Sequence, residues 1–158
     1  MHPETVSLPT AGSLAILYNY NKNGITDVGQ ANGKVLKMNP FYKYLTKEDH
    51  LHLQIVQYLN LQYKDSFWIH CPSEGRRTPF ERYKAKLLGL KKGIIDFLIF
   101  EKRIYAGLAI EIKIKPNKPT SEQLETMEKL QNRGWWTTVC YTFEQAKNII
   151  DWYLNLKN

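Results

Sequence analysis

Two short apolar runs, residues 93–100 and 107–113, stand out in the hydrophobic pattern of this chain. Both are rich in β-branched and aromatic residues and have the length of ordinary strands. The short segment between them suits a hairpin whose turn is centred on Arg103 and Ile104. In that register, one face is an unbroken apolar wall made of Ile95, Phe97, Ile99, Leu108, Ile110 and Ile112.

The other face of this hairpin carries charge. Asp96 lies opposite Glu111 at about 5 Å, and Lys113 points to the same side. A slip of one residue would push the carboxylates into the apolar wall, so the pattern favours this register. The three charges can simply neutralise one another as a salt-bridged cluster. Burying two like charges side by side is costly unless a cation compensates, so we favour a site for one divalent ion.

The order of these residues resembles the signature of the PD-(D/E)XK nuclease superfamily and, more narrowly, of the VRR-NUC family. That family has glycine-x-proline-aspartate, then glutamate-x-lysine, then a helix that carries a glutamine. The matching residues are Gly93, Asp96, Glu111, Lys113 and Gln123. Ile95 stands where the family usually has proline, which bears on the local turn and not on metal binding. The resemblance covers roughly residues 46–155.

The resemblance implies a restriction-endonuclease-like fold and a Mg²⁺ or Mn²⁺ cofactor. The metal ligands that it implies are Asp96, Glu111, the backbone carbonyl of Ile112 and, directly or through water, Glu48. It also implies that Lys113 orients the attacking water or neutralises developing charge. In the family the helical glutamine lies beside this lysine, and Gln123 matches it. Oxygen ligands of this kind are those that hard divalent cations prefer.

The region before the hairpin predicts a helix and a strand. Thr46 is the expected N-cap of a helix that runs to about Leu61. The inward stripe of this helix, at helical spacing, consists of Leu51, Ile55, Tyr58 and Leu59. Residues 67–70 are typical of a core strand.

After the hairpin, residues 120–123 predict a capping box that starts a helix ending near Gly134. Residues 136–141 predict a strand, and residues 142–145 a second capping box. The closing helix has an apolar stripe made of Ala146, Ile149, Ile150, Tyr153 and Leu154. We therefore expect an α/β fold with a mixed central β-sheet flanked by helices.

The chain is expected to contain one nuclease domain, residues 46–158, after an N-terminal extension, residues 1–45, of unknown role. Several of the candidate residues also have structural interpretations. Glu48, in the first turn of its helix, can interact favourably with the helix dipole. Gln123 can cap its helix, and this role is compatible with a second role in the active site. His52 stands where the family commonly has glutamine, and we interpret it as a structural polar contact. In the loop with Ser73, Glu74 either approaches the site or faces solvent.

Positive charge points to an anionic partner. The 158 residues carry a formal net charge of +7, which favours nucleic acid or an acidic membrane surface. A basic stretch leads directly into the strand that carries Asp96, and a lysine-bearing loop follows the next strand. The expected DNA-contacting residues are Arg76, Arg77, Arg82, Lys84, Lys86, Lys91, Lys92, Lys115 and Lys118. The alternative for such a stretch is a solvated face. The apolar residues within it, Phe80, Tyr83, Leu88 and Leu90, indicate partial order as a short helix.

We therefore interpret the sequence as that of a Mg²⁺- or Mn²⁺-dependent DNA endonuclease. Stand-alone members of the family resemble Holliday-junction resolvases and act as homodimers, which implies branched or double-stranded DNA as the partner. The alternatives are a non-catalytic DNA-binding module of the same fold and a basic structural protein of a larger assembly. No signal peptide or membrane span is evident, and Cys71 and Cys140 form no CxxC pair. We expect a cytoplasmic protein, for example one that is encoded by a phage or mobile element and acts in a bacterial host.

Overall fold

The computed structural model describes residues 43–71 and 78–156. The chain divides into two units, Met1–Leu45 and Thr46–Asn158, and the elements below belong to the second. Arg76 and Arg77, together with Ser73 and Glu74, lie outside the described residues.

A four-stranded mixed sheet forms the centre of the second unit, with strand order β1-β2-β3-β4. The strands are β1 (Trp68–His70), β2 (Phe97–Ile99), β3 (Leu108–Ile112) and β4 (Trp136–Cys140). The pairs β1–β2 and β2–β3 are antiparallel, whereas β3 and β4 are parallel. A parallel pair needs a crossover, and α4 (Ser121–Gln131) supplies it. The predicted α/β fold with a mixed sheet is confirmed.

The β2–β3 hairpin has the register that the hydrophobic pattern predicts. Phe97 pairs with Ile110, and Ile99 pairs with Leu108. Each of these four side chains is fully buried. Ile95 departs from the predicted wall, because it packs in a cluster with Ala109 and Met127 on the side of α4. The chain bends at Asp96, just before β2 begins, so the strict two-residue alternation does not extend back to Ile95.

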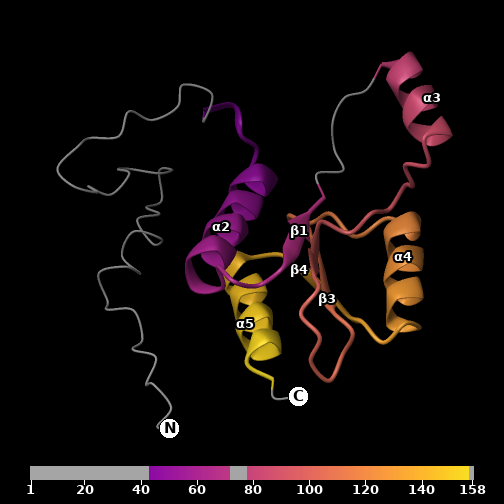
Figure 1. The fold of residues 1–158 in the computed structure, drawn as a ribbon. Coiled ribbons are helices and arrows are strands. Elements are labelled where there is room, and N and C mark those ends of the chain that lie inside the picture. Colours follow the sequence, from indigo (N-terminus) through magenta and orange to yellow (C-terminus); the bar gives the residue numbers. More distant parts are fainter. Residues whose placement is uncertain (1–42, 72–77, 157–158) are drawn as a thin grey trace, which may run out of the picture. The chain divides into compact units, whose positions relative to one another are not determined.

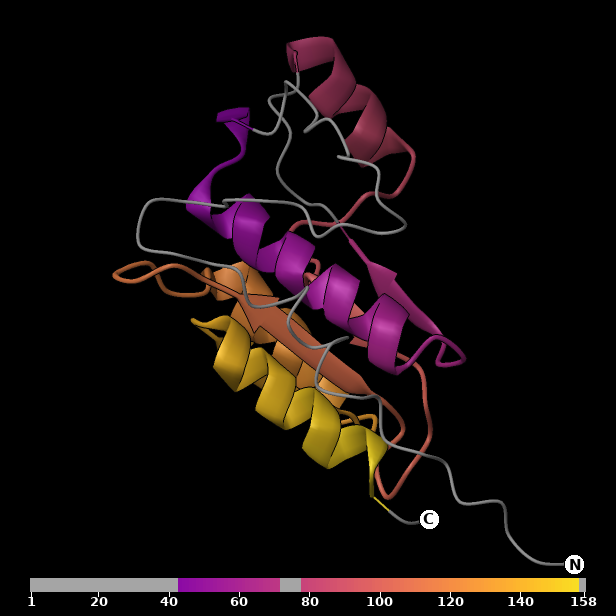
Figure 2. The same cartoon turned by 90° about the vertical axis from the view of Figure 1, so that its left-hand side faces the viewer.

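Helices cover both faces of the sheet. Figures 1 and 2 show α2 (Lys47–Gln62) and α5 (Phe143–Leu154) together on one face and α4 on the other. The stripe predicted for the first helix is buried as expected, with Ile55 and Leu59 fully so. Because both faces of the sheet are covered, both sides of β3 are enclosed, and every residue of this strand, including Glu111, is buried.

The helices begin where their capping residues predict. Thr46 and Thr120 cap α2 and α4, each with a reciprocal capping box. The second box predicted at residues 142–145 forms only in part. Thr142 accepts from the backbone N–H of Gln145, but the Gln145 side chain accepts from the N–H of Tyr141 instead. Helix α4 ends at Gln131, before the predicted end.

A further short helix, α3 (Pro79–Leu87), lies within the basic stretch. Thr78 caps it with a complete capping box, but none of its residues is buried. Within the described residues, no helix has both the length and the apolar character that a membrane span requires.

Candidate active site

Side chains from both helical layers meet β3 at one end of the sheet. Glu48 lies in the first turn of α2, and His52 follows one turn later on the same face. Asp96 directly precedes β2, and Glu111 is part of β3. Lys113 follows β3 and lies between the two layers, with its Nζ 2.5 Å from Glu111 and 3.8 Å from Glu48.

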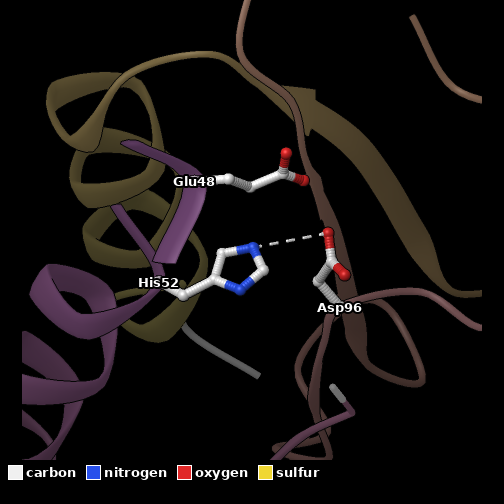
Figure 3. A group of neighbouring side chains, drawn as sticks. All are labelled: Glu48, His52 and Asp96. Carbon is white, nitrogen blue, oxygen red and sulfur yellow. Dashed lines mark ion pairs between the residues drawn. The ribbon is translucent and has the colours of Figure 1, made fainter. Parts of the chain in front are cut away.

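Asp96 is held firmly in place. Its carboxylate is 3% exposed and accepts a hydrogen bond of 2.8 Å from the backbone N–H of Ile112. The same oxygen, Oδ2, lies 3.7 Å from Nε2 of His52. Figure 3 shows the carboxylates of Glu48 and Asp96 and the imidazole of His52 directed toward one another. One ligand atom from each residue lies within 4.8 Å of the others.

Glu111 is the most deeply buried charged group of the site, with no exposed surface. Its Oε1 accepts hydrogen bonds from Lys113 and from the side-chain amide of Gln123. Its Oε2 is buried and has no hydrogen-bond partner. Burial raises the pKa of Glu111 to about 7, and the charge of Asp96 adds to this effect, which Lys113 only partly offsets. The positive charge of Lys113 is therefore too little to offset the burial of Glu111 and the repulsion from Asp96.

Lys113 is surrounded by acidic groups. Burial alone would lower its pKa, but Glu111, Asp96 and Glu48 outweigh that effect and raise the pKa above its ordinary value. The ammonium group therefore stays charged across the neutral range. One cation faces three carboxylates, so the site has a surplus of negative charge.

Gln123 makes both of the contacts that the sequence allows. Its carbonyl oxygen accepts from the backbone N–H of Thr120 as part of the capping box, and its amide nitrogen donates to Glu111. Gly93 explains how α4 comes so close. It has a φ of 71°, and a Cβ at this position would overlap the backbone of Glu122 and Gln123. A glycine is thus required where the segment before β2 passes the start of α4.

His52 is linked to a second histidine. Its Nδ1 lies 3.1 Å from Nε2 of His70, which ends β1. The ring of His70 stacks on Phe97, with centroids 4.6 Å apart and an interplanar angle of 18°. Sequence reasoning treated His52 as a structural contact and did not single out His70. The available signal was the i, i+4 spacing of Glu48 and His52 on one helix.

The described basic residues lie in three separate places, on α3, in a groove along α4 and in the loop between β3 and α4. Arg82, Lys84 and Lys86 are on α3, whose apolar residues Phe80 and Tyr83 are 71% and 64% exposed. Lys91 and Lys92 line a groove of about 520 Å³ along α4. That groove also contains residues that sequence reasoning did not select, namely Lys129 and Arg133, with Glu122 and Glu125. Lys115 and Lys118 lie in the loop between β3 and α4.

The donor set suits a divalent cation. Glu48 and Asp96 offer carboxylate oxygens and His52 offers an imidazole nitrogen, all within 4.8 Å of one another. Glu111 is not part of this group, but one of its carboxylate oxygens is buried without a hydrogen-bond partner. A buried carboxylate oxygen with no hydrogen bond is costly and calls for a positive partner. The residues present therefore fit a bound metal ion.

Comparison with known proteins agrees with this fold. The structure is similar to a solved VRR_NUC domain protein, with a TM-score of 0.62 and 26% sequence identity. The match covers 72% of this chain and 93% of that protein. No family model and no curated protein matches the chain. The α/β domain described above thus has the architecture of a VRR_NUC domain.

Proposed function

We propose that this protein is a metal-dependent nuclease of the VRR-NUC family, within the PD-(D/E)XK superfamily, that hydrolyses phosphodiester bonds in DNA. The observation that carries the proposal is the buried surplus of negative charge around Lys113. Three carboxylates share one ammonium group, and one carboxylate oxygen is left unpartnered. Such an arrangement destabilises a purely structural cluster but suits a site that binds a cation. The similarity to a VRR_NUC domain protein supports the same conclusion.

The candidate residues divide into metal-binding and substrate-facing groups. The metal would be held by Asp96 and Glu111, with the carbonyl of Ile112, and by Glu48 directly or through water. A bound Mg²⁺ or Mn²⁺ supplies Lewis-acid polarisation of the phosphate and a water of lowered pKa. Lys113 remains a cation at neutral pH, as its raised pKa requires, and donates to the attacking water or to the phosphate oxygens.

Gln123 positions the site and does not take part in the chemistry itself. It ties Glu111 to the first turn of α4, so the carboxylate keeps one orientation relative to Lys113. The capping bond to Thr120 holds the glutamine in turn. A side chain restrained at both ends is well suited to maintain catalytic geometry.

DNA is the proposed substrate because the chain is basic and its lysines and arginines flank the site residues in the sequence. The lysines and arginines of α3 and of the loops on either side of β2 and β3 offer phosphate contacts independent of base sequence. We further propose a homodimer that cuts branched DNA such as a four-way junction. Two cuts are needed to resolve a junction, and a dimer supplies two sites.

The test is a cleavage assay with end-labelled linear, flapped and four-way DNA, each with Mg²⁺, with Mn²⁺ and with EDTA. We expect cleavage with metal and none with EDTA, with the four-way DNA cut at paired positions. The oligomeric state is measured separately by sedimentation. Binding of every DNA without cleavage under any metal condition would instead favour a non-catalytic DNA-binding module.

A further inference from the structure

An imidazole stands among the carboxylates of the proposed metal site. The three groups that converge in Figure 3 include two oxygen donors, Glu48 and Asp96, but also the nitrogen donor His52. His52 is one helical turn from Glu48, so the same rigid segment of α2 presents both side chains. A nitrogen donor in this position changes which metal the site prefers.

The spacing of His52 and Asp96 fits two ligands of one ion. Their facing atoms, Nε2 and Oδ2, are 3.7 Å apart, which is beyond hydrogen-bond range. Two ligands that each lie about 2.1 Å from an octahedral ion are roughly 3 Å apart when adjacent and roughly 4.2 Å when opposite. The observed 3.7 Å exceeds the adjacent value by about 0.7 Å, so a small movement of one side chain would bring both atoms into one coordination shell. Asp96 is already oriented by its bond from the Ile112 N–H, so it needs little rearrangement to bind.

The second nitrogen of His52 has the kind of partner that metal-bound histidines use. Nδ1 lies 3.1 Å from Nε2 of His70. When the Nδ1–H of His52 donates a hydrogen bond to Nε2 of His70, the free lone pair of His52 lies on Nε2. This is the atom that faces Asp96. The stack of His70 on Phe97 fixes the acceptor ring in place. An outer partner of this type sets the tautomer and the direction of a ligating imidazole.

We propose that His52 is a ligand of the metal, that His70 is its positioning partner, and that the pair makes this site select Mn²⁺ over Mg²⁺. Mg²⁺ strongly prefers oxygen ligands and its own waters, whereas first-row ions such as Mn²⁺ accept imidazole nitrogen. This proposal rests on the proposed function, because that function is what requires a metal. The type of ligand, however, can be measured without DNA.

The first measurement is the thermal unfolding midpoint of the full chain, titrated with MnCl₂ or MgCl₂ after EDTA treatment and dialysis. An ion that binds only the folded state raises the unfolding midpoint, and the titration gives a half-saturating concentration for each ion. We expect His52→Gln to weaken Mn²⁺ binding by about tenfold or more while changing Mg²⁺ binding little. The matched control is His50→Gln on the same helix, outside the group of converging donors, which should keep the wild-type preference.

The second measurement detects the bond itself. Electron spin-echo envelope modulation of Mn²⁺ bound to the wild-type protein should show ¹⁴N coupling from a coordinated imidazole. The coupling should persist in His50→Gln and disappear in His52→Gln. His70→Phe keeps an aromatic ring against Phe97 but removes the acceptor, so it should keep the coupling and weaken Mn²⁺ binding by about tenfold.

Two results would overturn the inference. One is a wild-type Mn²⁺ complex with no ¹⁴N coupling, which decides the matter even if a variant fails to fold. The other is an unchanged ratio of Mn²⁺ to Mg²⁺ affinity in His52→Gln. If either result occurs while wild-type protein cleaves DNA with metal, the proposed function survives and only the role of His52 is lost. If neither ion shifts the midpoint, both proposals fail.

Discussion

Two clusters of charged side chains among the described residues join elements that are far apart in the sequence, and they differ in how well their charges are matched. In the first, which we term the tyrosine cluster, Asp151 of α5 accepts hydrogen bonds from Tyr58, Tyr63 and Lys147. In the second, the site cluster of Glu48, Asp96, Glu111, Lys113 and Gln123, three carboxylates face one lysine.

The two clusters shift carboxyl pKa values in opposite directions. Burial would raise the pKa of Asp151, but the bonds from Lys147, Tyr58 and Tyr63 outweigh it and leave the pKa below its ordinary value. Burial and the nearby Asp96 instead raise the pKa of Glu111 to about 7. In a cluster that stabilises the fold, hydrogen bonds and positive charge compensate the buried carboxylate. In a cluster retained for function, the carboxylate is only partly compensated. The following predictions test this distinction.

The largest expected difference concerns the two lysines. Lys113→Ala should lower single-turnover DNA cleavage by about a hundredfold or more, the usual cost of removing one group that stabilises the transition state. Lys147→Ala in the tyrosine cluster should leave cleavage by the folded protein unchanged, and its partly exposed pair should contribute less than about 1 kcal/mol to stability. Equal cleavage by Lys113→Ala and wild type would remove this lysine from the mechanism.

The second difference concerns the pH dependence of stability in EDTA. The raised pKa of Glu111 means that the folded state binds a proton more readily than the unfolded state, whose carboxyl has a pKa near 4.5. The destabilisation is therefore fully present above about pH 7 and is relieved as the pH falls toward 4.5. It amounts to at most about 3 kcal/mol.

The free energy of unfolding, measured with urea across this range, should show a wild-type penalty near pH 8 that Glu111→Gln lacks. For Asp151 the dependence has the opposite sign. Its lowered pKa contributes stability above pH 3.8, which is lost as the pH falls through the folded-state pKa. If the free energies of unfolding of wild type and Glu111→Gln change in parallel between pH 8 and pH 5, the charge of Glu111 is as well compensated as that of Asp151.

The smallest difference concerns the removal of one charge from each cluster. In EDTA, Asp96→Asn should raise the unfolding midpoint, because it keeps the shape and an acceptor for the Ile112 N–H while removing repulsion with Glu111. Asp151→Asn should lower it, at a cost of about 1–2 kcal/mol, because an amide cannot accept from all of its partners.

Added Mg²⁺ or Mn²⁺ should raise the midpoint of wild type and of Asp151→Asn, but that of Asp96→Asn much less. Destabilisation of Asp96→Asn in EDTA, together with an undiminished response to metal, would show that Asp96 is a structural partner. Our distinction between the two clusters would then be wrong.

Much of the fold follows from local patterns. The two-residue alternation around Asp96 and Glu111 specified the β2–β3 register, because any slip would bury the carboxylates in the apolar wall. The capping residues Thr46 and Thr120 specified where two helices begin, because the free N–H groups at the start of a helix need local acceptors. Signals of this kind depend on neighbours in the sequence or on one face of one element.

What the sequence by itself determined is therefore the elements, the hairpin and the residue types at the site. The tertiary structure decided which side chains meet. The bond between His52 and His70 joins residues on different elements, and the groove of Lys91 and Lys92 is completed by Lys129 on α4. Neither contact is indicated by a hydrophobic periodicity or a capping motif in the sequence. Such contacts depend on how helices pack on the sheet and on which rotamers the packing allows, and these are properties of the assembled core.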